Sequence, residues 1–380
     1  MAASSPTLPA VPAVSSPRTA PVPRPQSRLL ALDGLRLVAA LMVCLYHYVG
    51  RGGTVSASWH GSPDHIFPTL SRAAVYGNFG VQFFFVISGF VICMSSWGRT
   101  LGDFFRSRVA RLYPAYWVAL VLVTVASLLL PVVVHAVRLD EFLVNLTMLQ
   151  QPMGATRILG VCWTLWVEVR FYVLFALLVV LRGVTYRRVV LFACVWTAAA
   201  VLCHSSGNNL LNQVIMPEYA PFFIGGLALY LIHRFGSDLL AWGIVAMSWL
   251  LAQSEATGNL WGPHPHRNPY VVVLIVTLAF AAVAVVALGW MQWASWRWLV
   301  TAGALTYPFY LVHEHLGWFA IRVLHRGLGL PPWATLVTTV LGMLVLAWLI
   351  HRFVEKPFGP RLKRALKERK LGISSPGVEL

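Results

Sequence analysis

Ten long apolar runs constrain this chain more than any other feature of its sequence. A helix of about 20 apolar residues crosses a bilayer core about 30 Å thick, and each run approaches that length. We predict spanning helices at residues 31–50, 80–97, 112–134, 161–182, 188–204, 214–234, 238–252, 270–290, 299–321 and 333–351. The chain is 58% hydrophobic and 11% charged, whereas soluble domains are about 25% charged. These features exclude a soluble globular enzyme and predict an all-α, polytopic integral membrane protein with about ten transmembrane helices.

The segments outside the spans suggest three regions. Residues 1–28 are rich in Pro, Ala and Ser, a composition that cannot build a packed core, so we predict a disordered cytoplasmic tail. Residues 29–357 form the predicted transmembrane domain, and residues 358–380 a basic cytoplasmic tail. Residues 139–151, between the third and fourth runs, are too polar to span and predict a short interfacial helix.

The distribution of Lys and Arg predicts the orientation. With both termini in the cytoplasm, twenty of the 29 Lys and Arg residues lie inside, seven lie outside, and two fall within spans. Cytoplasmic loops carry the excess of Lys and Arg in membrane proteins, so we expect a multi-pass protein of the cell (cytoplasmic) membrane with both termini inside. The net charge of +16 then reflects topology, and we expect no nucleic-acid partner.

Several charged or titratable residues fall inside or at the edge of the predicted spans. Placing Asp, Lys or Arg at the centre of a membrane helix costs about 2.5–3.5 kcal/mol on insertion scales, so such residues normally face a protein or water-filled interior and mark function. The set comprises Asp33, Arg36, His47, Glu168, Arg170, Glu218, His313, Glu314 and His315.

The first span carries the most informative pair, Arg36 and His47. Their separation of eleven residues corresponds to about 20° beyond three helical turns, so both side chains share one helix face, roughly 16 Å apart along the axis. The helix therefore offers a fixed cation near its cytoplasmic end and a titratable imidazole three turns further on.

Two other segments add charge to the same region. Arg108 and Arg111 are i, i+3 neighbours on a helix that starts a span, so their guanidiniums can converge on one anion; ordinary cytoplasmic loop charge is the alternative interpretation. Glu168 lies in an aromatic-rich span and requires a cationic partner, for which His47 and an Arg are both suitable.

Taken together, these segments closely resemble the acyltransferase 3 family of bacterial integral membrane acyltransferases. The resemblance covers about residues 32–357, and the matching motifs are Asp33-Gly34 with Arg36 and His47, Phe79–Phe90, Arg108 with Arg111, Trp163–Tyr172, Tyr307–His313 and Glu355–Pro357. Two positions depart from the family pattern. Gln82 stands where the family often has Asp, and Val169-Arg170 replaces the usual Glu-Gln after Glu168.

The resemblance implies transfer of an acyl group, often acetyl, from cytoplasmic acyl-CoA to a hydroxyl of a carbohydrate or a glycosylated metabolite. His47 is the candidate general base, since neutral imidazole suits this role; it either deprotonates the acceptor or first takes the acyl group. Glu168 either orients His47 or balances Arg36. The candidates for binding the CoA phosphates are Arg36, Arg108 and Arg111, and further site candidates are Asp33, Trp163, Tyr307 and His313.

Other classes are less consistent with the sequence. A proton-coupled secondary transporter could use Arg36, His47 and Glu168 as a relay, but it does not require the paired arginines. The sequences His264-Pro265-His266 and His313-x-His315 lack acidic or Cys companions at ligand spacing, so we expect no metal. The expected partners are an acyl-CoA co-substrate, the acceptor and the lipid bilayer.

Overall fold

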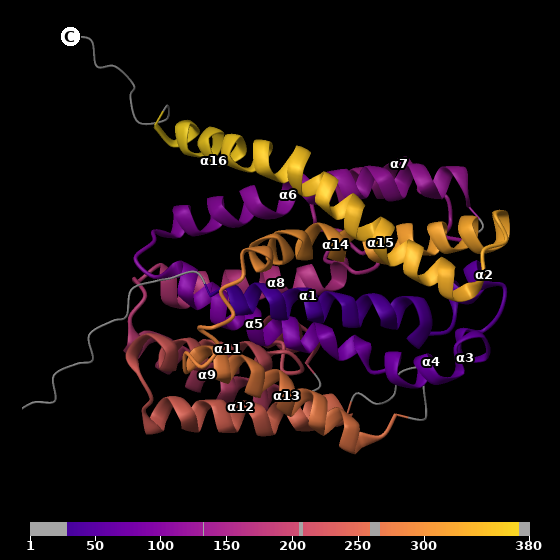
Figure 1. Ribbon diagram of the computed structural model, residues 1–380. Coiled ribbons are helices and arrows are strands. Elements are labelled where there is room, and N and C mark those ends of the chain that lie inside the picture. The colour runs from indigo at the N-terminus through magenta and orange to yellow at the C-terminus, as the bar shows by residue number, and fades with distance from the viewer. Residues whose placement is uncertain (1–28, 132, 205–207, 259–266, 372–380) are drawn as a thin grey trace, which may run out of the picture.

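The computed structural model describes residues 29–131, 133–204, 208–258 and 267–371. The tail predicted at residues 1–28 and the last nine residues of the chain lie outside the described residues. Every regular element in the described part is a helix, which confirms the all-α prediction. Figure 1 shows the long helices lying side by side in one bundle.

Ten long helices make up the bundle. They are α1 (Leu30–Leu45) with its π-helical continuation η1 (Tyr46–Gly50), α5 (Gly80–Ser96), α6 (Leu101–Leu129), α8 (Cys162–Phe175) with η3 (Ala176–Val180), α9 (Tyr186–His204), α11 (Ala220–Phe235), α12 (Leu239–Gly258), α13 (Pro269–Ala287), α14 (Arg297–Ile321) and α15 (Pro332–Ile350). The other helices connect them or follow them: η2 (Gly77–Phe79), α2 (Thr54–Trp59), α3 (Pro63–Ile66), α4 (Pro68–Ala74), α7 (Leu139–Asn145), α10 (Asn209–Ile215), η4 (Arg322–Gly327), η5 (His351–Glu355) and α16 (Lys356–Leu371).

The polytopic prediction is confirmed. Among the described residues, nine helical segments are long and apolar enough to cross a membrane, and they match nine of the ten predicted spans. The remaining predicted span corresponds to α14, a 25-residue helix. The polar residues His313, Glu314 and His315 interrupt its apolar surface, and it packs against α1, α6 and α15 inside the bundle.

Two predicted helix starts are wrong, each for a local reason. The third span starts at Leu101, not at residue 112, because the Thr100 side chain accepts a hydrogen bond from the Asp103 backbone N–H and caps the helix there. The long helix of the sixth span, α11, begins at Ala220, not at residue 214. Met216 adopts a left-handed backbone with φ of 54° and Pro217 cannot donate a backbone hydrogen bond, so α10 ends before α11 starts.

Glycines allow α5 and α11 to pack closely. A Cβ atom at Gly89 would collide with the carbonyl oxygen of Phe223, and one at Gly226 would collide with the carbonyl oxygen of Val86. Small residues at such positions let membrane helices approach backbone to backbone. This packing fixes α5, which carries Ser88, against α11.

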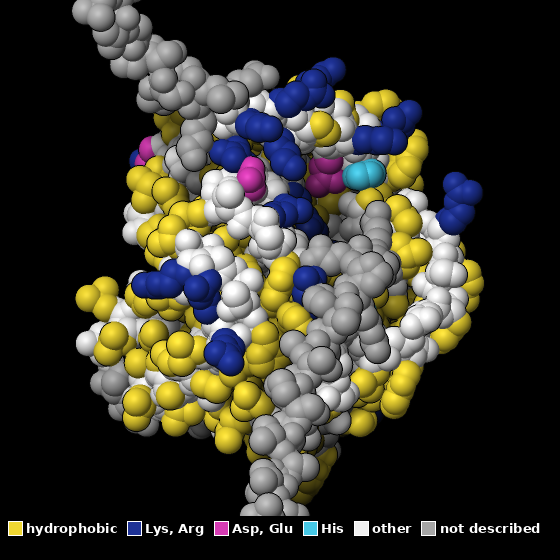
Figure 2. Space-filling view, turned by 90° about the vertical axis from the view of Figure 1, so that its left-hand side faces the viewer, with side chains coloured by type: hydrophobic (Ala, Val, Ile, Leu, Met, Phe, Trp, Pro, Cys, Tyr) yellow, Lys and Arg dark blue, Asp and Glu magenta, His cyan; other side chains and the backbone are white. Residues whose placement is uncertain are grey.

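The two ends of the bundle differ in charge. Figure 2 shows many Lys and Arg side chains gathered at the end where α1 begins. The basic segment after residue 356 is a helix, α16, which packs against α6. We call the end of the bundle where α1 begins the inner end and the end where α1 finishes the outer end.

Candidate active site

Three cavities follow one another along the bundle. The inner vestibule, of about 570 Å³, is lined in part by Asp33, Arg36, Arg111, Tyr307, His351 and Glu355. The central pocket, of about 90 Å³, is lined in part by Arg36, Ser88, Arg108, Arg111, Glu168 and Tyr310. The outer vestibule, of about 870 Å³, is lined in part by His47, Arg51, Arg157, Trp163, Glu314 and Trp318.

The helices show how these cavities are ordered. Arg36 and Arg111 line both the inner vestibule and the central pocket, so these two cavities adjoin. Tyr310 and Glu314 lie one turn apart on α14. Tyr310 lines the central pocket and Glu314 lines the outer vestibule. A hydrogen bond of 2.9 Å between the Thr164 and Tyr310 hydroxyls lies at the outer end of the central pocket.

The three arginines predicted to bind the donor meet at the central pocket. Arg36, on α1, lies 3.7 Å from the Asp33 carboxylate. Arg108 is only 7% exposed; its guanidinium donates to the Ser95 hydroxyl and lies 5.7 Å from the centre of the Tyr172 ring. Arg111, one turn along α6, lines the same pocket. A cluster of cations from two helices here suits an anionic ligand.

Glu168 lies with these arginines and not with His47. Its carboxylate accepts hydrogen bonds from Ser88 and Tyr172, and it lines the central pocket together with Arg36. Of the two roles left open by the sequence, the geometry places Glu168 where it can balance the arginine charge. The other candidates also lie along the cavities: Tyr307 donates to the Leu112 carbonyl at 2.9 Å, and Trp163 lines the outer vestibule.

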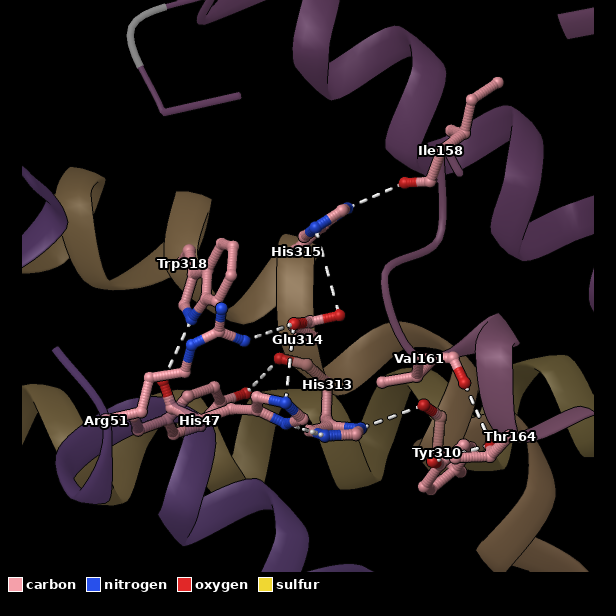
Figure 3. Close-up of polar contacts among 11 residues, drawn as sticks. His47, Arg51, Ile158, Val161, Thr164, Tyr310, His313, Glu314, His315 and Trp318 are labelled. Atoms are coloured by element: carbon pink, nitrogen blue, oxygen red, sulfur yellow. Dashed lines mark hydrogen bonds and ion pairs between the residues drawn. The ribbon is translucent and has the colours of Figure 1, made fainter. Parts of the chain in front are cut away.

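His47 lies on η1, at the outer end of α1, and is 9% exposed. Figure 3 shows its ring between His313 and Glu314 of α14. Its Nδ1 atom is 3.0 Å from Nε2 of His313, and its Nε2 atom is 3.4 Å from Oε1 of Glu314. Arg51 approaches the same carboxylate oxygen at 3.4 Å. Residues 266 positions apart in sequence therefore form one polar cluster.

Contacts around the ring fix η1 against α14. The Tyr48 hydroxyl donates to the His313 carbonyl at 2.6 Å, and the Trp318 indole donates to the His47 carbonyl at 3.0 Å. A Cβ atom at Gly317 would collide with the Tyr48 side chain, so the glycine is required for this approach. In both contacts the acceptor is a backbone carbonyl, so neither depends on the charge of the His47 ring.

The hydrogen bonds also select the tautomer of His47. Nδ1 of His313 lies 2.9 Å from the Tyr310 carbonyl, which can only accept, so in neutral His313 this nitrogen carries the proton and Nε2 is an acceptor. Nδ1 of His47 therefore donates to His313. The lone pair of neutral His47 is left on Nε2, the nitrogen that faces Glu314 and the outer vestibule. This is the arrangement that a general base requires.

Glu314 and Arg51 are the site residues that sequence reasoning missed. Glu314 is 5% exposed, and its presence in an apolar span was a signal, but nothing in the sequence paired it with His47. Arg51 follows the first predicted span and is one of the seven Lys and Arg residues predicted to lie outside. Arg170, the residue that departs from the family pattern, lies elsewhere: it donates to the Gln213 carbonyl at 2.6 Å and lines a separate cavity beside α10.

The fold and the site define a class: a helical membrane protein with a buried histidine cluster beside an outer vestibule and an arginine cluster around a central pocket. Comparison with known families gives the particular family. The acyltransferase domain of the acyltransferase 3 family matches residues 29–352, and the chain belongs to this family. It is a membrane acyltransferase, and the transporter alternative is not favoured. Searches of curated proteins and of solved structures found no match to the chain.

Proposed function

We propose that this enzyme transfers an acetyl group from acyl-CoA, bound at the inner end, to a hydroxyl of a carbohydrate or glycosylated metabolite bound in the outer vestibule. The observation that carries the proposal is the division of groups between the two ends. The arginines line the inner cavities, whereas the basic nitrogen of His47 faces the outer vestibule.

The inner end suits the donor. CoA carries several phosphate charges, and Arg binds phosphate through charge-assisted, often bidentate, hydrogen bonds. Arg36 and Arg111 line both the inner vestibule and the central pocket, so they are placed to hold CoA while its thioester points through the central pocket toward His47. The central pocket measures about 90 Å³, which suits a short acyl group such as acetyl.

The outer vestibule suits a carbohydrate. Trp163 and Trp318 line it, and such rings present a broad apolar face with a polar edge. Polar side chains that include Arg157 and Gln151 line the same cavity and offer partners for sugar hydroxyls. Under the predicted topology this cavity opens on the side opposite to the cytoplasm, so acylation would occur across the membrane.

The chemistry follows from the tautomer of His47. Nε2 takes the proton from the acceptor hydroxyl as its oxygen attacks the thioester carbonyl carbon. The C–S bond then breaks and CoA leaves as a thiolate toward the inner end. General-base catalysis of this kind contributes about a hundredfold to ten-thousandfold in rate.

The test compares acyl esters in a strain lacking this protein with those in its parent. Envelope glycans and secreted glycosides are isolated from both strains, and ester-linked acetate is measured in each fraction. We expect one fraction to lose its acetate in the deletion strain and to regain it when the wild-type protein is restored, but not when His47→Gln is supplied. Unchanged acetate in both fractions would refute the proposed acceptor class.

A further inference from the structure

The hydrogen bonds that run inward from His47 form a branch that cannot carry a proton onward. Nδ1 of His47 donates to Nε2 of His313 at 3.0 Å, and Nδ1 of His313 donates to the Tyr310 carbonyl at 2.9 Å. A backbone carbonyl accepts hydrogen bonds but holds no proton of its own. His313 is completely buried. Among the described residues, a proton taken up by His47 therefore has no titratable hydrogen-bond acceptor beyond His313 on the side of the thioester.

The outward branch is different. Oε1 of Glu314 lies 3.4 Å from Nε2 of His47, and Oε2 of Glu314 lies 3.9 Å from Nε2 of His315. Nδ1 of His315 lies 2.7 Å from the Ile158 carbonyl, so its proton is on Nδ1 and its Nε2 lone pair faces the carboxylate. Oε2 of Glu314 has no hydrogen-bond partner. The carboxylate thus stands between two imidazole nitrogens that both accept protons.

All three side chains of this branch reach solvent-accessible space. His47, Glu314 and His315 line the outer vestibule. The separations of 3.4 and 3.9 Å exceed a normal hydrogen bond, and catalytic contacts often shorten only when substrate is bound, or are bridged by water. The branch therefore leads from the base to the outer cavity.

Other charged and titratable groups face Glu314 from several elements. Arg51, which follows η1, lies 3.4 Å from Oε1. Tyr48 of η1, Tyr310 of α14 and Cys162 of α8 interact with it electrostatically. Of these, Arg51 is the fixed cation, and it forms an ion pair with the Glu314 carboxylate.

We infer that the proton removed from the acceptor hydroxyl leaves through Glu314 and His315 into the outer vestibule, so that each acyl transfer releases one proton at the outer end. This inference rests on the proposed function. The O–H bond of the acceptor breaks and its proton passes from His47 to Glu314 and then to the vestibule. The C–S bond breaks as the C–O bond forms, and the CoA thiolate takes one proton from water at the inner end. Each turnover thus consumes a proton on one side and releases one on the other.

The test uses the full-length protein in sealed vesicles that hold a pH-sensitive dye and the glycan fraction of the deletion strain. Acetyl-CoA is added outside the vesicles and does not cross the bilayer. Only protein molecules whose inner end faces the outside of the vesicle can therefore react. Valinomycin and K⁺ remove any membrane potential. The free CoA thiol formed outside and the ester formed inside are measured together with the pH of the lumen.

The outcomes separate the inference from the proposed function. We expect the lumen to acidify by one proton for each CoA thiol formed, and a proton ionophore to abolish the acidification without stopping transfer. Ester formation without acidification of the lumen would overturn the inference and leave the proposed function standing. Absence of both thiol and ester would refute the proposed function itself.

Variants then test the route. Glu314→Gln keeps the size of the side chain but cannot carry a proton, so we expect transfer to fall at least tenfold with unchanged acetyl-CoA affinity. Imidazole buffer in the lumen should restore part of the rate, which a merely structural defect would not allow. His325→Gln is the matched control, since His325 lies on η4 and contacts the Leu330 carbonyl outside this branch. Wild-type rates in Glu314→Gln would overturn the route.

Discussion

Nδ1 of His47 lies 3.0 Å from Nε2 of His313, and this contact determines which nitrogen of His47 faces the outer vestibule. The Tyr310 carbonyl orients His313, and His313 in turn orients His47. Two helices that are remote in sequence must therefore pack against each other before the Nε2 lone pair of His47 can face the outer vestibule. The residues around this pair lead to specific predictions.

Replacement of His47 by Gln should abolish acyl transfer. Gln keeps the approximate size and hydrogen-bonding capacity of the side chain but has no basic nitrogen, so we expect a loss of at least a hundredfold in kcat. Binding of acetyl-CoA should persist, because the arginines lie at the other cavity. Thiol release and isothermal titration with acetyl-CoA measure the two effects. Transfer at the wild-type rate by folded His47→Gln would place the base elsewhere.

Replacement of His313 should act through His47. In His313→Phe the acceptor for Nδ1 of His47 is lost, so His47 can adopt the unproductive tautomer, and we expect kcat to fall at least tenfold. His313→Gln, which can still present an amide oxygen, should retain more activity than His313→Phe. Equal activity of the two variants, both folded by thermal melting, would show that His313 does not orient the base.

Replacement of Arg108 or Arg111 by Ala should weaken donor binding. Each lost charge-assisted contact to phosphate corresponds to about 1.5–3 kcal/mol, or roughly tenfold to a hundredfold in affinity. The effect on KM for the acceptor should be small. Arg187→Ala, at an exposed position on α9, serves as the control. An unchanged affinity for CoA in the double variant would reduce both arginines to topological signals.

Replacement of Gly160 by Ala should displace Glu314. A Cβ atom at residue 160 would overlap the Glu314 carboxylate, so the carboxylate must move away from His47 and Arg51. We expect slower transfer with little change in acetyl-CoA affinity. Gly342→Ala is the control, because nothing lies within 4 Å of its Cβ position. Equal kinetics of the two variants would argue against a role for the position of Glu314.

The orientation of the chain can be tested with reporter fusions. Both termini are predicted to be cytoplasmic, so a fusion after Lys370 should report the cytoplasm and one at Gly207 the opposite side. The positive-inside rule is the basis of this expectation. If both fusions report the same side, the topology is incorrect, and the assignment of the inner vestibule to the cytoplasm fails with it.

The sequence predicted the helices well where the apolar pattern was long. The boundaries went wrong at Thr100 and at Met216, where a side-chain cap and a left-handed backbone define the helix ends. Such features depend on a single residue and leave the average hydropathy of a run unchanged. The common face of Arg36 and His47 follows from helical periodicity alone and stays a prediction, since His47 lies on the π-helical turn η1.

The sequence did not predict which charged side chains contact each other. The sequence placed Glu168 near either His47 or an arginine, and only the packing of α5, α6 and α8 around one pocket puts it with Arg36 and Arg108. The pairing of Glu314 with His47 likewise depends on the contact between α1 and α14. The sequence shows which charged residues fall inside apolar spans, where burial is unfavourable. It does not show which residue of another helix compensates each charge.

The sequence by itself therefore determined that this chain is a helical membrane protein and which family it resembles, and it supplied candidates for the residues that carry its chemistry. The length of an apolar span, the charge of a loop and the order of motifs depend only on the order of residues along the chain, so they can be inferred from the sequence. Tertiary structure alone decided that His47 is coupled to His313 and Glu314, that its Nε2 atom faces the outer vestibule, and that the arginines lie at the other cavity. These facts depend on distances of a few ångströms between helices, because hydrogen bonds and charge interactions in a low-dielectric interior act only between groups that packing brings together.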